Sequence, residues 1–149
     1  MALRPGSDAP PIAGVEPGRG PMALFFFKVT CPVCRMAAPK AAAFAEAYQG
    51  RIVGVGEDPA PQVTTFSHET GMGFDAVSDP APYPASDAYG IEVVPTLFVV
   101  DGDGRIVESV ESWDRDGYNR ASHALAGLTG LPYREISAGA DGLPAFRPG

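Results

Sequence analysis

The sequence lacks the features that define several classes of protein. It contains no run of 18 or more apolar residues, so we expect no membrane-spanning helix. Only 2 cysteines are present, too few for a secreted scaffold held together by disulfides. Basic residues are scarce as well, because 11 Lys and Arg stand against 18 Asp and Glu, for a net charge of -7. This balance argues against nucleic acid or an anionic lipid surface as the main partner.

The chain nevertheless has what a single folded domain needs. Its 149 residues fit one domain, and a composition of 45% apolar and 19% charged residues can bury a core. We divide it into an irregular, proline-rich lead-in (1–22), a folded domain (23–130) and a Gly/Pro-rich tail (131–149) to which we assign no helix or strand. No apolar signal region opens the sequence, so we expect a cytoplasmic location, or a periplasmic or other extracytoplasmic one if a signal segment was trimmed.

Apolar runs alternate with helical patterns between residues 23 and 130. The apolar runs predict strands at 23–27, 51–55, 76–78, 96–100 and 105–110. Helical spacing and end signals predict helices over 32–48, 58–71, a short stretch ending at 90, and 115–130. The side chains expected to face inward from these helices are Met36, Phe44, Tyr48, Tyr118, Ala121, Leu125 and Leu128. This order predicts an α/β fold, with a central mixed sheet flanked by helices and an antiparallel C-terminal hairpin that turns at 101–104.

The two cysteines form a Cys31-Pro32-Val33-Cys34 motif where the first strand meets the first long helix. Cys31 falls at the helix N-terminus, where unpaired N–H groups and the positive end of the helix dipole favour a thiolate. The thiolate is the reactive form of cysteine. Cys34 follows about one turn later, close enough to form a disulfide with Cys31. We therefore predict a redox cycle in which Cys31 attacks a partner disulfide and Cys34 resolves the mixed disulfide.

Other interpretations of the pair are a zinc site, a structural disulfide and two buried thiols. A zinc site would need more ligands, and only His68 and His123 are available, at a spacing unlike that of zinc fingers. We expect both histidines on the surface. A redox pair is favoured because the motif sits at a strand-to-helix junction.

The residues around the pair carry a more specific signal. The run Cys31-Pro32-Val33-Cys34-Arg35-Met36-Ala37-Ala38-Pro39 resembles the active-site helix of thioredoxin-like proteins. In that superfamily a basic residue follows the second cysteine, and a proline five residues after that cysteine kinks the helix. Pro39 takes that position here and should remove one hydrogen bond inside the helix.

A second stretch, from Asp87 to Asp101, is similar to the part of TlpA- and ResA-like thioredoxins that runs from a short helix into a Val-Pro-Thr turn and a strand. The resemblance implies that Pro95 follows a cis peptide bond and faces the cysteine pair. It also implies that Val94 offers its backbone to an extended substrate segment. We expect Pro32 and Val33, between the cysteines, to contact the substrate too.

Glu57 follows the strand at 51–55, so it should lie on the same edge of the sheet as Cys31. The Val-Gly-Glu sequence here resembles the glutamate-bearing segment of the ResA-like branch. We predict that Glu57 tunes thiol ionisation or shuttles a proton for Cys34. The alternative is an exposed loop carboxylate that caps the next helix.

Two positions depart from thioredoxin itself. Phe25 stands where thioredoxin has a buried aspartate on the first strand, so that proton relay is absent. Thr30 replaces the tryptophan that commonly precedes the first cysteine. Both departures bear on the redox potential and the partner class, and neither removes Cys31 or Cys34.

The resemblance spans about residues 20–126 and implies a thioredoxin fold of the TlpA/ResA-like or redoxin type. The function it implies is thiol–disulfide oxidoreduction on protein thiols and disulfides, with electrons from an upstream redoxin and no metal or organic cofactor. One alternative is a peroxiredoxin, but the Thr and Pro that its peroxidatic motif requires are replaced by Lys28 and Leu24. The other is a non-enzymatic metal-binding or chaperone module on the same fold.

Overall fold

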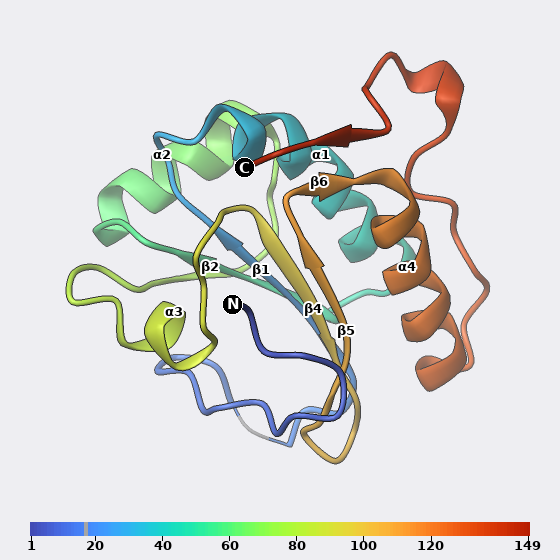
Figure 1. Ribbon diagram of the computed structural model, residues 1–149, viewed down its shortest axis with the longest axis horizontal. Coiled ribbons are helices and arrows are strands. Elements are labelled where there is room, and N and C mark those ends of the chain that lie inside the picture. Colours follow the sequence, from blue (N-terminus) through green and yellow to red (C-terminus); the bar gives the residue numbers. More distant parts are fainter. Residues whose placement is uncertain (17) are drawn as a thin grey trace.

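Five strands form a mixed sheet in the centre of the protein (Figure 1). The computed structural model describes residues 1–16 and 18–149, and Pro17, part of the expected lead-in, lies outside the described residues. The strands are β1 (Met22–Phe27), β2 (Ile52–Gly56), β3 (Ala76–Ser78), β4 (Thr96–Val100) and β5 (Ile106–Glu111), in the spatial order β3-β2-β1-β4-β5. Strands β2 and β3 run parallel to β1, whereas β4 is antiparallel to β1 and forms the expected hairpin with β5.

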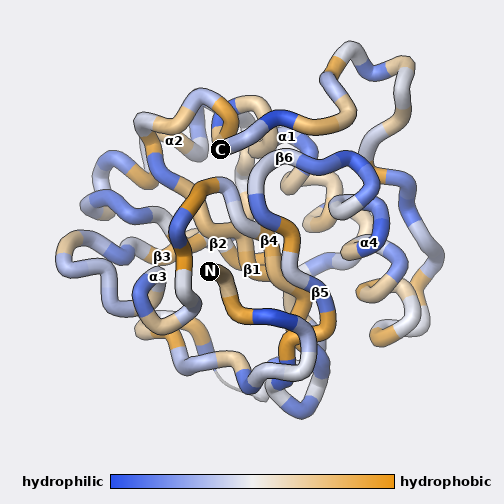
Figure 2. The backbone as a smooth tube through the Cα atoms, in the orientation of Figure 1, coloured by the Kyte–Doolittle hydropathy of each residue, from blue (hydrophilic) through white to orange (hydrophobic). Residues whose placement is uncertain are grey.

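The central strand β1 explains why the sequence shows an unbroken apolar run. Alternate residues of a strand point to opposite faces of the sheet. Phe25 and Phe27 join one hydrophobic core, whereas Leu24 and Phe26 join a second core on the other face. All of β1 is buried, and Figure 2 shows the strands of the sheet as mainly apolar segments in the interior. This confirms a strand covered on both faces.

Three helices cover one face of the sheet. The helices α1 (Pro32–Ala47), α2 (Ala60–Thr70) and α4 (Arg115–Thr129) contribute to the first core. The short α3 (Pro84–Ala88) and parts of the N-terminal segment, including Ala2 and Ile12, pack in the core on the opposite face. None of the helices in the described part of the chain is long and apolar enough to cross a membrane.

The expected thioredoxin fold and the expected order of elements are confirmed, and the structure corrects one helix residue. Tyr118, Ala121 and Leu125 are fully buried on α4, but Leu128 is 40% exposed. The prediction that Leu128 faces inward is therefore wrong. The last turn of α4 extends past the edge of the core, and Leu131 just beyond it is exposed as well.

The segment after α4 contains structure that we did not predict. It forms a 3-10 turn η1 (Gly139–Asp141) and a short strand β7 (Phe146–Arg147). Strand β7 pairs antiparallel with β6 (Trp113–Asp114), which follows β5. Assigning no element to 131–149 was wrong, because two-residue strands carry no periodicity that a sequence could reveal.

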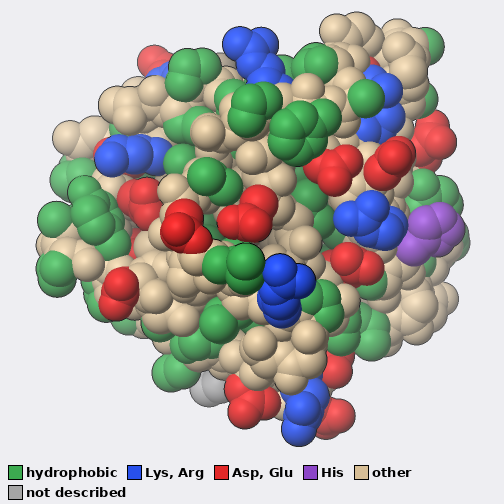
Figure 3. Space-filling model, viewed as in Figure 1, with side chains coloured by type: hydrophobic (Ala, Val, Ile, Leu, Met, Phe, Trp, Pro, Cys, Tyr) green, Lys and Arg blue, Asp and Glu red, His purple; other side chains and the backbone are tan. Residues whose placement is uncertain are grey.

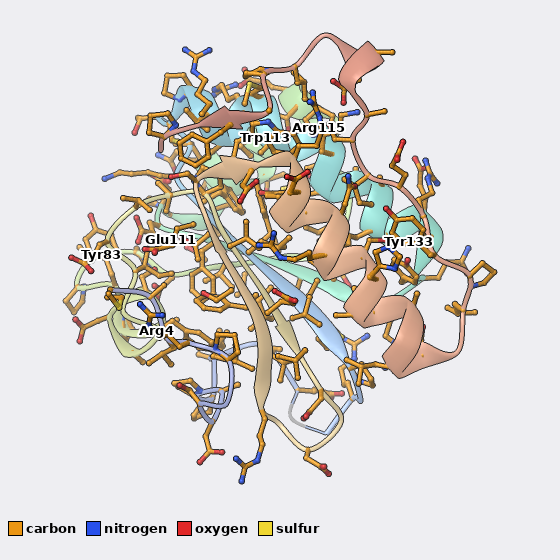
Figure 4. The ribbon with its side chains drawn as sticks, turned by 45° about the vertical axis from the view of Figure 1, so that its right-hand side comes forward. Arg4, Tyr83, Glu111, Trp113, Arg115 and Tyr133 are labelled. Carbon is orange, nitrogen blue, oxygen red and sulfur yellow. The ribbon has the colours of Figure 1, made fainter. Side chains whose placement is uncertain are left out.

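Side chains under this segment hold it in place. The indole N–H of Trp113 donates a hydrogen bond to the carbonyl of Pro144 at 2.7 Å. Arg115 donates to the carbonyl of Leu143 at 2.7 Å, and Lys40 forms an ion pair with Asp141 at 2.9 Å. Figure 4 shows Trp113 and Arg115 beside the chain that ends in β7. The fully buried Trp113 is a packing residue, as we expected.

Candidate active site

Cys31 stands at the start of α1 with its sulfur held by the helix backbone. It is the N-cap residue, and its Sγ accepts a hydrogen bond from the Cys34 N–H at 3.1 Å. Pro32 occupies the first helical turn, where a missing N–H costs nothing. Cys31 is half-buried, so its sulfur remains accessible to another molecule. The helix terminus thus directs an N–H donor at an accessible thiol.

The pKa of Cys31 is lowered to about 6. The largest cause is the hydrogen bond from the Cys34 thiol, and partial burial opposes it. Backbone N–H groups of Cys34 and Val33 lower the pKa further. Because these donors stabilise the charged sulfur, most of Cys31 is thiolate at neutral pH.

Cys34 is the opposite case. It is fully buried, and burial raises the pKa of its thiol far above the ordinary range. The hydrogen bond to Cys31, the charge on Cys31 and the charge on Glu57 raise the Cys34 pKa further. The pair therefore combines one accessible thiolate with one protected, protonated thiol, and both are free cysteines.

The loop before β4 lies directly against the nucleophile. In its protonated form, the Cys31 thiol donates to the carbonyl oxygen of Val94 at 3.4 Å. The Val94–Pro95 peptide bond is cis, which confirms the prediction for Pro95. A second cis bond, Ala81–Pro82, was not predicted.

Two polar residues that we had not singled out fix this loop. The buried Thr96 donates its hydroxyl to the Val93 carbonyl at 2.8 Å. The backbone N–H of Ser112 donates to the Pro95 carbonyl at 2.8 Å, and Ser112 has a positive φ of 70°. Thr96 could have been noticed because it follows Pro95 directly. Ser112 carries no sequence signal, because it contacts Pro95 through its backbone N–H, a group that every residue except proline has.

Glu57 reaches the edge of the sheet that carries the cysteines. Gly56, just before it, pairs with Phe27 at the end of β1, and the Glu57 N–H donates to the Phe27 carbonyl at 3.0 Å. Its carboxylate is half-buried and acts on the pKa of Cys34 through its charge. No side chain caps α2, so the helix-capping alternative for Glu57 is not observed.

The neighbouring carboxylate Asp58 has a structural task that the sequence did not reveal. Its Oδ2 accepts a hydrogen bond from the Val29 N–H at 2.9 Å. Val29 belongs to the loop between β1 and Cys31, so Asp58 ties the cysteine loop to the end of β2. The other expected positions around the pair are Val33, which is buried, and Pro32 and Thr30, which are exposed.

Tyr118 of α4 brings a buried hydroxyl into the same core as Cys34. Burial is the main reason that the pKa of Tyr118 is raised, and the charges of Cys34 and Cys31 add to it. Among the described residues the hydroxyl has no hydrogen-bond partner. Its ring packs against Trp113, with ring centroids 4.6 Å apart.

The described part of the chain contains no cluster of three or more His, Cys, Asp or Glu side chains that could hold a metal ion. His68 and His123 are both exposed, as expected. The face in Figure 3 shows acidic and basic side chains interspersed over the surface.

The pH dependence of Cys31 follows from its lowered pKa. With a pKa of about 6, about nine-tenths of the thiol is ionised at pH 7 and about a tenth at pH 5. Alkylation by iodoacetamide should thus slow about tenfold from pH 7 to pH 5, measured by mass spectrometry. A rate that keeps rising about tenfold per pH unit from pH 5 to pH 8 would show an ordinary thiol and contradict the lowered pKa. By the same linkage, ionisation of Cys31 stabilises the folded reduced protein fully above the unfolded thiol pKa of ~8.5, and this gain disappears as the pH falls through about 6.

The chain matches one protein family and resembles several solved structures. The profile of the AhpC/TSA family matches residues 15–109. No curated protein matches the chain. Among solved structures, the thioredoxin domain of a thiol-disulfide oxidoreductase from Bacteroides vulgatus has a TM-score of 0.70 at 22% identity, covering 83% of this chain and 99% of that one.

Two further structures have the same fold. A thiol:disulfide interchange protein from a Bacteroides species has a TM-score of 0.69 at 21% identity, over 87% of this chain and 93% of its own. A secreted disulfide oxidoreductase from Mycobacterium tuberculosis is described as homologous to E. coli DsbE. It has a TM-score of 0.60 at 21% identity, covering 73% of this chain and 82% of its own. At this level of identity the three structures establish the thioredoxin-like fold.

Proposed function

The chain belongs to the AhpC/TSA family, and from this premise we propose that it is a thiol–disulfide oxidoreductase whose reactive groups are Cys31 and Cys34. The observation that carries the proposal is the contrast between the two thiols. Cys31 is accessible and has a pKa of about 6, whereas Cys34 is buried and has a raised pKa. One sulfur is thus ready to attack, and the other is kept back for the second step.

The reaction begins with the Cys31 thiolate. It attacks one sulfur of a substrate disulfide, forms a mixed disulfide and releases the first substrate thiolate, which takes a proton from water. Cys34 then loses its proton and attacks the sulfur of Cys31. This step releases the second substrate thiol and leaves a Cys31–Cys34 disulfide. Two electrons have moved from the protein to the substrate, and the reverse sequence oxidises a substrate dithiol.

The second step needs a base, because burial keeps the Cys34 thiol protonated at neutral pH. Glu57 is the carboxylate whose charge acts on Cys34. In this proposal it accepts the Cys34 proton as the sulfur attacks. Proton removal is thereby tied to the moment when the mixed disulfide is present.

The proposed substrates are proteins that present an extended segment. Val94 has a backbone carbonyl beside Cys31, which suits hydrogen bonding to such a segment. Pro32 is exposed and Val33 adjoins it, so both are proposed as contact residues. Electrons would come from an upstream redoxin. The similarity to a protein described as secreted supports an extracytoplasmic location, and the comparisons give the cytoplasmic expectation no support.

Peroxide reduction is the second candidate, favoured by the family match itself. In the structure, Lys28 lies near the Tyr83 ring, with its ammonium 5.9 Å from the ring centroid, and Leu24 is part of the core behind the sheet. Neither can supply the hydroxyl that the peroxidatic motif uses. Disulfide exchange is therefore the function that the site supports best.

A redox equilibrium tests the proposal. The protein is incubated in glutathione buffers of graded ratio, quenched with acid and alkylated, and its state is read by mass spectrometry. We expect one reversible transition between the dithiol and a Cys31–Cys34 disulfide, together with catalysed reduction of a protein disulfide by the reduced form. A pair that stays reduced in every buffer, or a protein that reduces hydrogen peroxide but no disulfide, would refute it.

A further inference from the structure

The chain's own segment 146–149 lies on the loop that faces the nucleophile. A Cβ built on Gly149 would collide with the carbonyl oxygen of Val94 and would lie 2.8 Å from its carbonyl carbon. Only a glycine can approach this peptide so closely. The same Val94 oxygen accepts the hydrogen bond from Cys31. The segment and the nucleophile thus meet at one backbone group, and Figure 1 shows β7 running back across the molecule toward the start of α1.

We propose that residues 146–149 act as an intrachain strap that covers the substrate-binding edge of β6 and must leave before a protein substrate can bind. The proposal rests on the proposed function and extends it. It also defines the binding edge, which runs from Val94 along β6. A substrate would add there as an extended strand, in the place that β7 now takes.

The contacts of the strap are those that an extended peptide would make. Arg147 is paired with Trp113, and Phe146 is paired with Asp114, by backbone register. The Gly149 N–H donates to the Ser112 hydroxyl at 3.0 Å. Ser112 thereby links the strap to the Pro95 loop, since its own N–H is bonded to the Pro95 carbonyl. When the strap leaves, the β6 edge and the Val94 carbonyl become available together.

The strap is held weakly enough to open. All four of its residues are exposed, and Phe146 leaves 56% of its surface in solvent. The firm attachments lie before it, at Pro144 and Leu143, where Trp113 and Arg115 donate hydrogen bonds. Opening therefore breaks a two-residue ladder and one side-chain hydrogen bond. Such short, exposed segments belong to the least stable parts of a fold.

Two substitutions weaken the strap without touching the cysteines. Gly149→Ala places a methyl group against the Val94 peptide. Ser112→Ala removes the hydroxyl that accepts from Gly149 and keeps the backbone bond to Pro95. The matched control is Gly139→Ala, in the same tail, because nothing lies within 4 Å of a Cβ added there. A chain that lacks residues 146–149 gives the kcat/KM of a protein whose strap is always open.

The test compares kcat/KM for a disulfide-bonded protein with that for the small aromatic disulfide 5,5′-dithiobis(2-nitrobenzoate). If the strap is closed most of the time, both substitutions should raise kcat/KM for the protein about three- to tenfold, as the open fraction rises. The rate on the small disulfide should not change in Gly149→Ala, and Gly139→Ala should change neither rate. Trp113 is the only tryptophan and adjoins β7, so its fluorescence should follow binding of an unreactive extended peptide, which tightens by a similar factor in the variants.

The outcomes separate this proposal from the proposed function. Equal rates on the protein disulfide in all variants would overturn the strap and leave the oxidoreductase intact. A parallel rise with the small disulfide would also overturn it, because the segment would then act on Cys31 itself. Absence of exchange with every disulfide, in every variant, would refute the proposed function.

Discussion

Replacing Cys31 with serine is expected to reduce disulfide exchange by more than about a thousandfold. A serine hydroxyl is not ionised near neutral pH, so the accessible nucleophile is lost. Cys34 cannot take over, because it is fully buried and its pKa is strongly raised. The measurement is the rate of reduction of a protein disulfide with excess dithiol as the electron source.

Cys34→Ser provides the control. It leaves the attacking sulfur in place and removes the resolving one, so a mixed disulfide between Cys31 and the substrate should accumulate and be visible by mass spectrometry. Cys34→Ala, which has no side-chain donor, also removes the thiol hydrogen bond that lowers the pKa of Cys31 most, so attack by Cys31 should be slower at acidic pH in that variant than in the parent protein. If Cys31→Ser kept the parent rate, Cys31 would not be the nucleophile.

Much of the fold was predictable from local pattern. Long elements such as the helix that begins at Pro32 and the strand at Met22–Phe27 carry strong signals, because burial on a face imposes a period on the sequence. The hairpin at 101–104 follows from its turn residues. The wrong prediction for Leu128 shows what a helical period leaves out. The period indicates which face of the helix a residue lies on, but it does not indicate where along the helix the core ends.

The site was predictable where chemistry fixes residue types. Thiol–disulfide exchange requires two cysteines close together, so Cys31 and Cys34 stand out in the sequence. The Val94–Pro95 turn stands out because it resembles a segment of a known family. Ser112 and the strap were not predictable. Their role depends on a contact between distant parts of the chain, because Gly149 lies against Val94, more than fifty residues earlier. Neither a periodic pattern nor a short motif predicts such a contact. A two-residue strand leaves no pattern at all.

Replacing Glu57 with glutamine should slow the resolving step at least about a hundredfold. Two effects of the substitution oppose each other. Removing the negative charge lowers the pKa of Cys34, which favours its ionisation, but the charge of Glu57 is the smallest of the causes that raise that pKa. Removing the carboxylate also removes the proton acceptor for a thiol that burial keeps protonated. Because burial is the larger cause, loss of the base should dominate.

The step can be observed alone. Cys31 is first converted to a mixed disulfide with thionitrobenzoate, and release of the coloured thiol then reports attack by Cys34. The preceding attack by Cys31 should keep its rate in Glu57→Gln, since hydrogen bonds from Cys34 and Val33 and partial burial set the pKa of Cys31, and the charge of Glu57 does not. Glu69→Gln is the matched control, because Glu69 is an exposed carboxylate paired with Arg35 at 3.0 Å. If release of the thiol became faster in Glu57→Gln, Glu57 would act on Cys34 through its charge and not as a base.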